Sequence, residues 1–314
     1  MKNVSLRNLR ISHARYDAAL TRLLETIELA GSNAACIPFL GPTRVGKSDL
    51  LACVKSQVSK NRSGPGYMIP SPDFLSGEIS PKPNDAELYA SVIRKMGRVA
   101  ANSKLSLLQD RMYDLLEQRD VRIVALDECS HCAEPGANLT RRAAADHFKT
   151  MIDRSGVTLI LIGLPKFQRL IDENEQLAAR SMATIELHPY RWTNSDDRNE
   201  FTTVIYSIFD YLHEHGVSLE FDWIDMSRRL FAASGGRVGR VIELLEAAVR
   251  SAARSDVLAL SDIRKAAVMR LQGLAQRPPI FDLDPPEDDV LLRSYAKVMR
   301  DAGLRLPVPS RTIT

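Results

Sequence analysis

Cysteine is scarce in this sequence: four residues among 314 are too few for a scaffold held together by disulfide bonds. Long hydrophobic runs are also missing, because no stretch reaches the roughly 18 consecutive apolar residues that a membrane-spanning helix requires. Residues 1–20 lack the apolar segment of a secretory signal peptide. These absences lead us to expect a cytoplasmic protein with reduced thiols and no membrane partner.

No charge of one sign dominates, since 42 lysines and arginines stand against 39 aspartates and glutamates and leave a formal net charge of +3. A balance this close to zero does not by itself indicate a nucleic-acid-binding protein, and it leaves room for a local basic surface. The composition, 45% hydrophobic and 26% charged, excludes a disordered chain. At about 150 residues per domain, the length predicts two domains.

Short apolar runs alternate with helical patterns over the first part of the chain. Strands are expected at 36–40, 121–126 and 157–162, with a weaker one at 183–187 and a short one at 67–69 within the Gly-, Pro- and Ser-rich stretch 61–84. Helices are expected over 14–30, 48–60, 85–99, 105–118 and about 140–154. Apolar strands separated by helices are typical of an α/β fold with a parallel sheet covered on both faces.

After about Trp192 the apolar residues follow helical spacing alone, which predicts a small all-helical domain. A proline-rich linker is expected over 276–286 and a short helix over 288–302. The chain is therefore divided into an N-terminal helical segment (1–31), an α/β domain (32–193), a helical domain (194–275) and a tail (276–314). The tail is a candidate partner-docking segment, because it is poorly patterned and lies outside both domains.

Residues 41–48 fit the phosphate-binding pattern G-x-x-x-x-G-K-[ST], with an apolar strand before them and a helix after them. The backbone N–H groups of such a loop and the N-terminus of the following helix surround the phosphates of a nucleotide. Lys47 is expected to bind the β- and γ-phosphates of ATP, and the Ser48 hydroxyl to bind Mg²⁺. The candidate nucleotide-binding residues are Gly41, Pro42, Thr43, Arg44, Val45, Gly46, Lys47, Ser48 and Asp49.

Two acidic residues follow the strand expected at 121–126. Asp127 is expected to hold the Mg²⁺ shell together with Ser48, and Glu128 to orient and deprotonate the attacking water. A water-activating base beside the metal ligand favours ATP hydrolysis over phosphorylation of a small acceptor. Glu128 and Lys47 are therefore the expected catalytic residues.

The series ISHARYDAAL, GPTRVGKS, VALDECSH, TLILIGLPK, ENEQLAARS and SGGRVGRVIELLEAA resembles the TniB and TnsC ATPases of transposons, which are relatives of MuB and IstB. The resemblance covers about residues 10–275. Its more specific marks are the N-terminal Ile11, His13 and Arg15, then His131 three residues after Glu128, and finally the L-x-x-R segment that ends at Arg180.

The resemblance implies a P-loop AAA+ ATPase with a parallel five-stranded sheet and a small all-helical lid domain. It implies that ATP-bound subunits assemble head-to-tail into a filament or ring around duplex DNA, contacting the backbone without reading sequence. Such an assembly links a target-selection protein to a DDE transposase and disassembles as ATP is hydrolysed. The target-selection protein is TniQ-like, acting alone or with an RNA-guided complex as in CRISPR-associated transposons.

The resemblance also assigns roles to individual arginines. Arg180 matches the arginine finger that reaches the γ-phosphate of the neighbouring subunit. Arg237 and Arg240 match the second sensor of the lid, and either one is a candidate contact to the nucleotide. Gly163 stands where many AAA+ proteins have a polar sensor, so this first sensor stays unassigned and slow hydrolysis is one consequence.

The family contacts DNA from segments between the two nucleotide motifs, and residues 82–104 carry a local charge of +3. Lysine and hydroxyl side chains there suit phosphate contacts, which position a protein without reading sequence. The candidate DNA-binding residues are Lys82, Arg94, Lys95, Arg98, Ser103 and Lys104.

Three other functions stay open. The chain is compatible with an AAA+ ATPase of another system, such as a helicase loader or a secretion-associated ATPase, although no segment for those partners is evident. A small-molecule kinase is disfavoured by the helical second domain and by the L-x-x-R segment. A nucleotide-binding adaptor that scarcely hydrolyses ATP is kept open by Gly163.

Overall fold

The computed structural model describes residues 4–6, 9–31, 33–60, 74–99, 103–134, 136–252, 256–270, 280–281 and 284–304. The strand expected at 67–69 and most of the linker expected at 276–286 lie outside these residues. Contacts divide the chain into two compact units. The sheet unit consists of Ala18–Gly41 and Lys47–Leu187, and the helical unit of Met1–Asp17, Pro42–Gly46 and His188–Thr314.

A five-stranded sheet forms the centre of the sheet unit, and every pair of neighbouring strands is parallel. The strands are β1 (Cys36–Leu40), β2 (Phe74–Glu78), β3 (Ile123–Asp127), β4 (Thr158–Gly163) and β5 (Ile185–Glu186), in the order β2-β3-β4-β1-β5. The parallel sheet expected from the apolar runs is thus confirmed. The strand β2 was not expected, since its sequence FLSGE holds two polar residues and a glycine.

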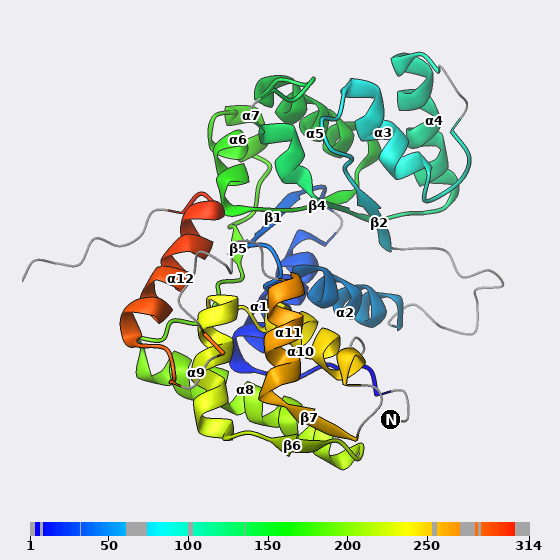
Figure 1. Cartoon of the computed structure of the whole chain (residues 1–314). Helices are drawn as coiled ribbons and strands as arrows, with labels where there is room; N and C mark the ends of the chain where they lie inside the picture. Colours follow the sequence, from blue (N-terminus) through cyan, green and yellow to red (C-terminus); the bar gives the residue numbers. More distant parts are fainter. Residues whose placement is uncertain are drawn as a thin grey trace, which may run out of the picture. The chain divides into compact units, whose positions relative to one another are not determined.

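Helices cover both faces of this sheet (Figure 1). One face carries α2 (Lys47–Lys60) and the later part of α1 (Ala14–Ala30); the other carries α3 (Asp85–Ile93), α4 (Leu105–Gln118), α5 (Arg141–Ser155), α6 (Gln168–Asp172) and α7 (Glu175–Ala178). This distribution follows from right-handed crossovers, because β1 to β2 runs in one direction along the sheet and the later connections run in the other. The α3 helix ends at Ile93, six residues earlier than expected, where Lys95, Met96 and Gly97 form turns.

The parallel sheet has two chemically different edges. At the carboxyl edge, the phosphate loop follows Leu40 of β1, and Asp127 ends β3, which is separated from β1 by β4. At the amino edge, the backbone N–H of Cys36, the first residue of β1, donates to the carbonyl of Arg180 at 2.8 Å. Ligands of open α/β sheets bind at the carboxyl edge, so the sheet places Lys47 and Asp127 where a nucleotide is expected.

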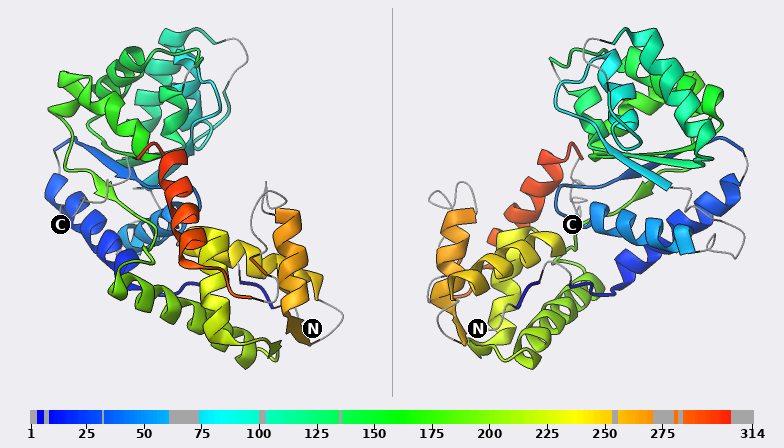
Figure 2. Two further views of the ribbon diagram at one scale, coloured as in Figure 1. Left: turned by 60° about the vertical axis from the view of Figure 1, so that its left-hand side comes forward. Right: turned by 90° about the vertical axis from the view of Figure 1, so that its right-hand side faces the viewer.

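The helical unit is built from α8 (Ser195–Glu214), α9 (Trp223–Ser234), α10 (Val238–Ser251), α11 (Leu260–Arg270) and α12 (Asp288–Asp301). Helices α10 and α11 lie side by side, as do α9 and α12 (Figure 2). Their apolar stripes meet in one core that includes Phe201, Ile205, Leu230 and Leu245.

The expectation that this region is all-helical is wrong. Two short strands, β6 (Ser218–Glu220) and β7 (Val257–Ala259), pair in parallel. Three-residue strands are too short to show a period of two in the sequence, which explains why they were missed. The short helix expected at 288–302 is confirmed as α12, and Leu291 and Phe281 of the expected tail belong to the core of the helical unit. No helix among the described residues is long and apolar enough to cross a membrane.

Candidate nucleotide site

The phosphate loop has the backbone conformation of an anion cradle. Arg44 adopts a positive φ of 63° and Gly46 a φ of 115°, a value that a residue with a side chain rarely tolerates. Alternation of left- and right-handed residues turns successive N–H groups toward one side of the chain. The Nζ of Lys47 donates to the carbonyl of Gly41 at 2.7 Å, so the lysine closes the loop on itself.

Lys47 is electrostatically poised for a phosphate. Burial lowers the pKa of Lys47 from its ordinary value of 10.5 to about 8, although the carboxylates of Asp127 and Glu128 act in the opposite direction. A buried ammonium group without full compensation attracts an anion strongly, because the ligand replaces the solvation that the fold removed. The loop is therefore suited to bind a polyphosphate, whose negative charge would compensate for the desolvation of the Lys47 ammonium group.

Ser48 and the acidic pair meet at the carboxyl edge of the sheet. The Ser48 hydroxyl donates to Asp127 Oδ2 at 3.0 Å, and the backbone N–H of Glu128 donates to Asp127 Oδ1 at 2.8 Å. A hydroxyl and a carboxylate in contact are oxygen donors of the kind that Mg²⁺ binds, so these residues fit that ion. Glu128 is exposed and has a left-handed φ of 58°, which turns the chain sharply out of β3 into the short helix Cys129–Ala133.

The structure explains why glycine occupies the position of the first sensor. A Cβ at Gly163 would lie 2.7 Å from the hydroxyl oxygen of Ser130, which accepts a hydrogen bond from the backbone N–H of Leu164 at 2.6 Å. A polar side chain at the end of β4 is sterically excluded by this hydroxyl. The first sensor therefore stays unassigned.

Within the helical unit, the start of α10 contacts the tip of the phosphate loop. Arg237, the residue before α10, donates from Nη1 to the carbonyl of Thr43 at 3.3 Å. Gly239 lies so close to the loop that an added Cβ would be 2.6 Å from the carbonyl oxygen of Arg44. The guanidinium of Arg44 is 3.7 Å from Glu243, one turn further along α10.

The two candidate lid arginines differ in their surroundings. Arg237 contacts the phosphate loop, whereas Arg240 is bound on both sides by other groups: Nη1 donates to Glu243 at 2.6 Å and Nη2 to the carbonyl of Arg270 at 2.6 Å. Of the two residues expected to serve the second sensor, Arg237 is the one that the structure brings to the loop.

Arg180 lies at the amino edge of the sheet. Its backbone is fixed at both ends, because Arg180 N–H donates to Leu177 O at 3.0 Å and Arg180 O accepts from Cys36. Its guanidinium is held by Asp153 of α5, with Nε 2.5 Å from Oδ1 and Nη2 3.0 Å from Oδ2. Arg180 and Glu128 therefore belong to opposite edges of one sheet.

The expected DNA-binding residues lie before α3, after α3 and directly before α4. Lys82 stands between two prolines with a φ of 52°, an unusual conformation for a residue before proline. Its carbonyl accepts a hydrogen bond from the Asn138 side chain at 2.9 Å, and its own side chain is exposed. Backbone in a sparsely populated region must be held by its surroundings, and the hydrogen bond from Asn138 is one such contact.

The remaining candidates for DNA binding are not equivalent. Arg94 forms two hydrogen bonds with Glu87, at 2.5 and 2.9 Å, and this pair lowers the pKa of Glu87, so its charge is largely compensated. Three cations are exposed and one hydroxyl residue is half-buried; these are Lys95, Arg98, Lys104 and Ser103. Arg94 is thus paired with Glu87, whereas Lys82, Lys95, Arg98 and Lys104 are exposed cations.

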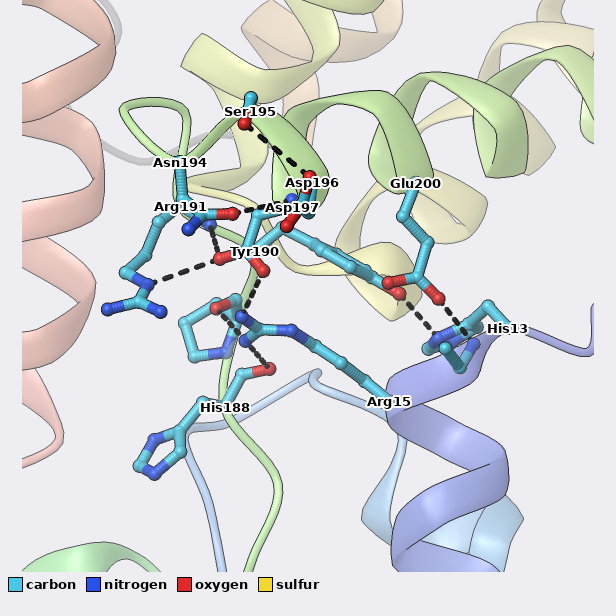
Figure 3. A network of polar contacts seen from close by, with 12 residues as sticks. His13, Arg15, His188, Tyr190, Arg191, Asn194, Ser195, Asp196, Asp197 and Glu200 are labelled. Carbon is cyan, nitrogen blue, oxygen red and sulfur yellow. Dashed lines mark hydrogen bonds and ion pairs between the residues drawn. The ribbon is translucent and has the colours of Figure 1, made fainter.

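The N-terminal motif is anchored by a polar network in the helical unit (Figure 3). Arg15 donates from Nη2 to Asp197 Oδ1 at 2.5 Å and from Nη1 to the carbonyl of Pro189 at 2.7 Å. Its guanidinium lies over the ring of Tyr190, 4.9 Å from the centroid. The hydroxyl of Tyr190 is 2.7 Å from Nδ1 of His13. His13 and Arg15 therefore hold the beginning of α1 against Tyr190 and the first turn of α8.

Asp197, the acidic partner in this network, is not among the residues that the sequence predicts for a site. It is buried in the first turn of α8, whose N-cap is Asn194, and it also accepts from the backbone N–H and Nε of Arg191 at 3.0 and 3.1 Å. Burial alone would raise the pKa of Asp197, but the bonds from Arg15 and Arg191 together lower it. The sequence signal was no more than an acidic residue at a helix start, which usually serves the helix dipole alone.

Comparisons with known proteins identify the family and the fold. A family model described as the bacterial TniB protein matches residues 6–192. The Aeropyrum pernix Orc1 protein, solved in complex with DNA, is 17% identical, with a TM-score of 0.64 over 96% of this chain and 82% of that chain. Cdc6p from Pyrobaculum aerophilum is 13% identical, with a TM-score of 0.61 over 97% of this chain and 85% of that chain.

A further similar structure is the Aeropyrum pernix Orc2 protein with ADPNP and ADP, which is 15% identical, with a TM-score of 0.58 over 99% of this chain and 86% of that chain. At such identities the likeness establishes the fold, and the α/β AAA+ fold expected from the sequence is confirmed. The comparison with curated proteins found no match.

Proposed function

This chain belongs to the TniB family, and from that membership we propose that it is an ATP-dependent, DNA-binding AAA+ regulator of transposition. The observation that carries the enzymatic part of the proposal is the contact of Ser48, the residue after Lys47, with Asp127, the residue before Glu128. The proposal has three parts: ATP hydrolysis, self-assembly and DNA binding.

The chain's own groups account for hydrolysis. The phosphate loop and Lys47 bind and orient the β- and γ-phosphates, and Ser48 and Asp127 would hold Mg²⁺, which neutralises charge that develops on the phosphates. Glu128 accepts the proton of the attacking water, since its side chain is exposed and it directly follows Asp127, the proposed Mg²⁺ ligand. The proposed stoichiometry is one ATP and one water converted into ADP and phosphate.

Self-assembly is supported by the position of Arg180. Its backbone pairs with Cys36 at the start of β1, and the phosphate loop begins at Gly41 beyond the far end of this strand. At about 3.3 Å per residue, the strand separates the two ends by roughly 16 Å, which exceeds the reach of an arginine side chain. If Arg180 acts on a phosphate, that phosphate belongs to another copy of the chain, and head-to-tail contacts of this kind build filaments or rings.

DNA binding is supported by the exposed cations around α3 and α4. The strained Lys82 and the N-cap residue Lys104 present flexible ammonium groups suited to backbone phosphates. Repetition of weak contacts along an assembly multiplies their effect through avidity. The Orc1 protein, which has this fold, was solved in complex with DNA, so the fold is compatible with such a role.

The proposed partners follow from family membership. The assembly on duplex DNA receives a TniQ-like target-selection protein, with or without an RNA-guided complex, and recruits a DDE transposase. Hydrolysis of ATP then disassembles the filament or ring, so that its subunits leave the target DNA.

The test is a turnover assay of the wild-type chain, Lys47→Ala and Glu128→Gln, each with and without duplex DNA. We expect the wild-type chain to hydrolyse ATP, and duplex DNA to increase the rate. Lys47→Ala should lose nucleotide binding, and Glu128→Gln should bind ATP but hydrolyse it at least about a hundredfold more slowly. Equal turnover by the wild-type chain and Glu128→Gln would overturn the assignment of Glu128 as the base. Negligible turnover by the wild-type chain would favour a nucleotide-binding adaptor.

A further inference from the structure

The guanidinium of Arg180 is held from two sides rather than free on the surface. Asp153 accepts hydrogen bonds from Nε and Nη2, which is the two-point geometry that fixes a guanidinium in its plane. Nη1 donates to the carbonyl of Gln176 at 2.8 Å. These contacts use three of the five N–H donors of an arginine, which leaves two for a further acceptor.

The root of the side chain is equally well fixed. Leu177 is fully buried and holds the backbone of Arg180 through a hydrogen bond, and α7 packs against α5, the helix that carries Asp153. Arg180 and Asp153 are each about one third exposed, at 33% of the side chain. The pair is therefore rigid at its base and accessible at its tip, as a group that must meet an external ligand requires.

A second cation adjusts the charge of this cluster. Lys149 lies one turn before Asp153 on α5, with its Nζ 3.0 Å from Asp153 Oδ2. Hydrogen bonds from Arg180 and Lys149 hold the pKa of Asp153 below its usual value, so the carboxylate stays ionised near neutral pH. The three groups together carry one positive charge, which suits an incoming phosphate.

We propose that Asp153 is a positioning residue for the site formed between two copies of the chain. It fixes the guanidinium of Arg180 so that the two remaining N–H donors are ready for the γ-phosphate bound by the neighbouring copy. This inference rests on the proposed role of Arg180 across the interface. Asp153 itself touches no substrate; it removes the rotational freedom that a surface arginine would otherwise lose when the phosphate binds.

A mixing experiment isolates this role. Glu128→Gln chains cannot activate water but still supply Arg180, whereas Arg180→Ala chains keep their own site but supply no finger. Each variant alone should hydrolyse ATP slowly, and an equal mixture should regain about a quarter of the wild-type turnover, because random assembly gives half of the intact sites an intact finger and half of the sites are intact.

Asp153→Asn is then introduced into one chain of the mixture at a time. On the Glu128→Gln chain, which supplies the finger, it should lower the regained kcat about tenfold with KM for ATP unchanged, because a misplaced group loses stabilisation of the transition state only. On the Arg180→Ala chain, which supplies none, the regained turnover should persist. A merely structural effect would act equally in both placements.

Asp146→Asn on the finger-supplying chain is the matched control, since Asp146 lies on the same helix but bonds to Asn174 instead of an arginine. It should leave the regained turnover unchanged. Recovered turnover that is indifferent to Asp153→Asn in either chain overturns the role of Asp153 alone. A mixture that recovers no turnover overturns the role of Arg180 across the interface, and the inference about Asp153 falls with it.

Discussion

Replacement of Asp197 by asparagine tests how the N-terminal motif is anchored. The Asp197 side chain is 11% exposed and that of Arg15 is 22% exposed, so their ion pair is largely shielded from water. The carboxylate accepts from Arg15 and twice from Arg191 (Figure 3). Asparagine keeps the shape and one oxygen, but it removes the charge and turns donors toward donors.

The expected loss of stability follows from this burial. Removal of one partner from a buried ion pair costs about 3–5 kcal/mol, because the other charge stays desolvated. Since the asparagine oxygen still accepts one hydrogen bond, we expect about 3 kcal/mol for Asp197→Asn. For a unit of this size each kcal/mol lowers Tm by about 2–4 °C, so the transition of the helical unit should fall by about 6–12 °C.

Differential scanning calorimetry at neutral pH measures this difference, and Asp196→Asn is the matched control. Asp196 lies in the same helical turn but is exposed, so its loss should cost less than about 1 kcal/mol through the helix dipole. The pKa of Asp197 is lowered in the folded chain, so its contribution is complete above the ordinary value of 3.8 and disappears as pH falls below it. Equal destabilisation by both variants would refute the reasoning.

Three further predictions concern nucleotide and DNA. Since burial holds the pKa of Lys47 at about 8 and bound phosphate favours the ammonium form, ATP affinity should fall by up to about tenfold per pH unit above pH 8; titration calorimetry that finds equal affinity at pH 7.5 and 9.5 would contradict this. Combined Lys82→Ala and Lys104→Ala should weaken duplex binding and reduce the slope of log affinity against log salt by about 2, and an unchanged slope would exclude both residues as phosphate contacts. Gly239→Ala should lower ATP affinity about tenfold, because its Cβ would press on the carbonyl of Arg44; nucleotide binding at wild-type strength would show that α10 does not constrain the loop.

The elements that could be predicted from the sequence are those that local chemistry specifies. The phosphate loop needs its glycine and lysine at one spacing, and this pattern predicts both, together with Asp127 at the end of the next long apolar run. The structure places the Ser48 hydroxyl 3.0 Å from Asp127, as a shared site requires. The apolar stripes of helices such as α8 and α10 are likewise predictable, because these helices are long enough for the helical spacing to repeat over several turns.

The features that escaped prediction depend on contacts between distant segments. Strand β2 pairs with β3 through its backbone, and its polar sequence carries no alternation that would reveal it. The bond between Arg180 and Asp153 joins residues 27 positions apart, and the anchor of Arg15 on Asp197 spans 182 positions. A single sequence shows the arginines but not their acidic partners, since many surface carboxylates satisfy the same pattern.

Electron microscopy of the purified chain with linear duplex DNA tests the central claim most directly. The protein is imaged with a non-hydrolysable ATP analogue and, in parallel, with ADP, and Arg180→Ala is imaged under both conditions. The account predicts filaments or rings of the wild-type chain on DNA with the analogue and none with ADP. For Arg180→Ala it predicts fewer or shorter assemblies with the analogue. Single subunits that leave the DNA bare with either nucleotide would contradict it.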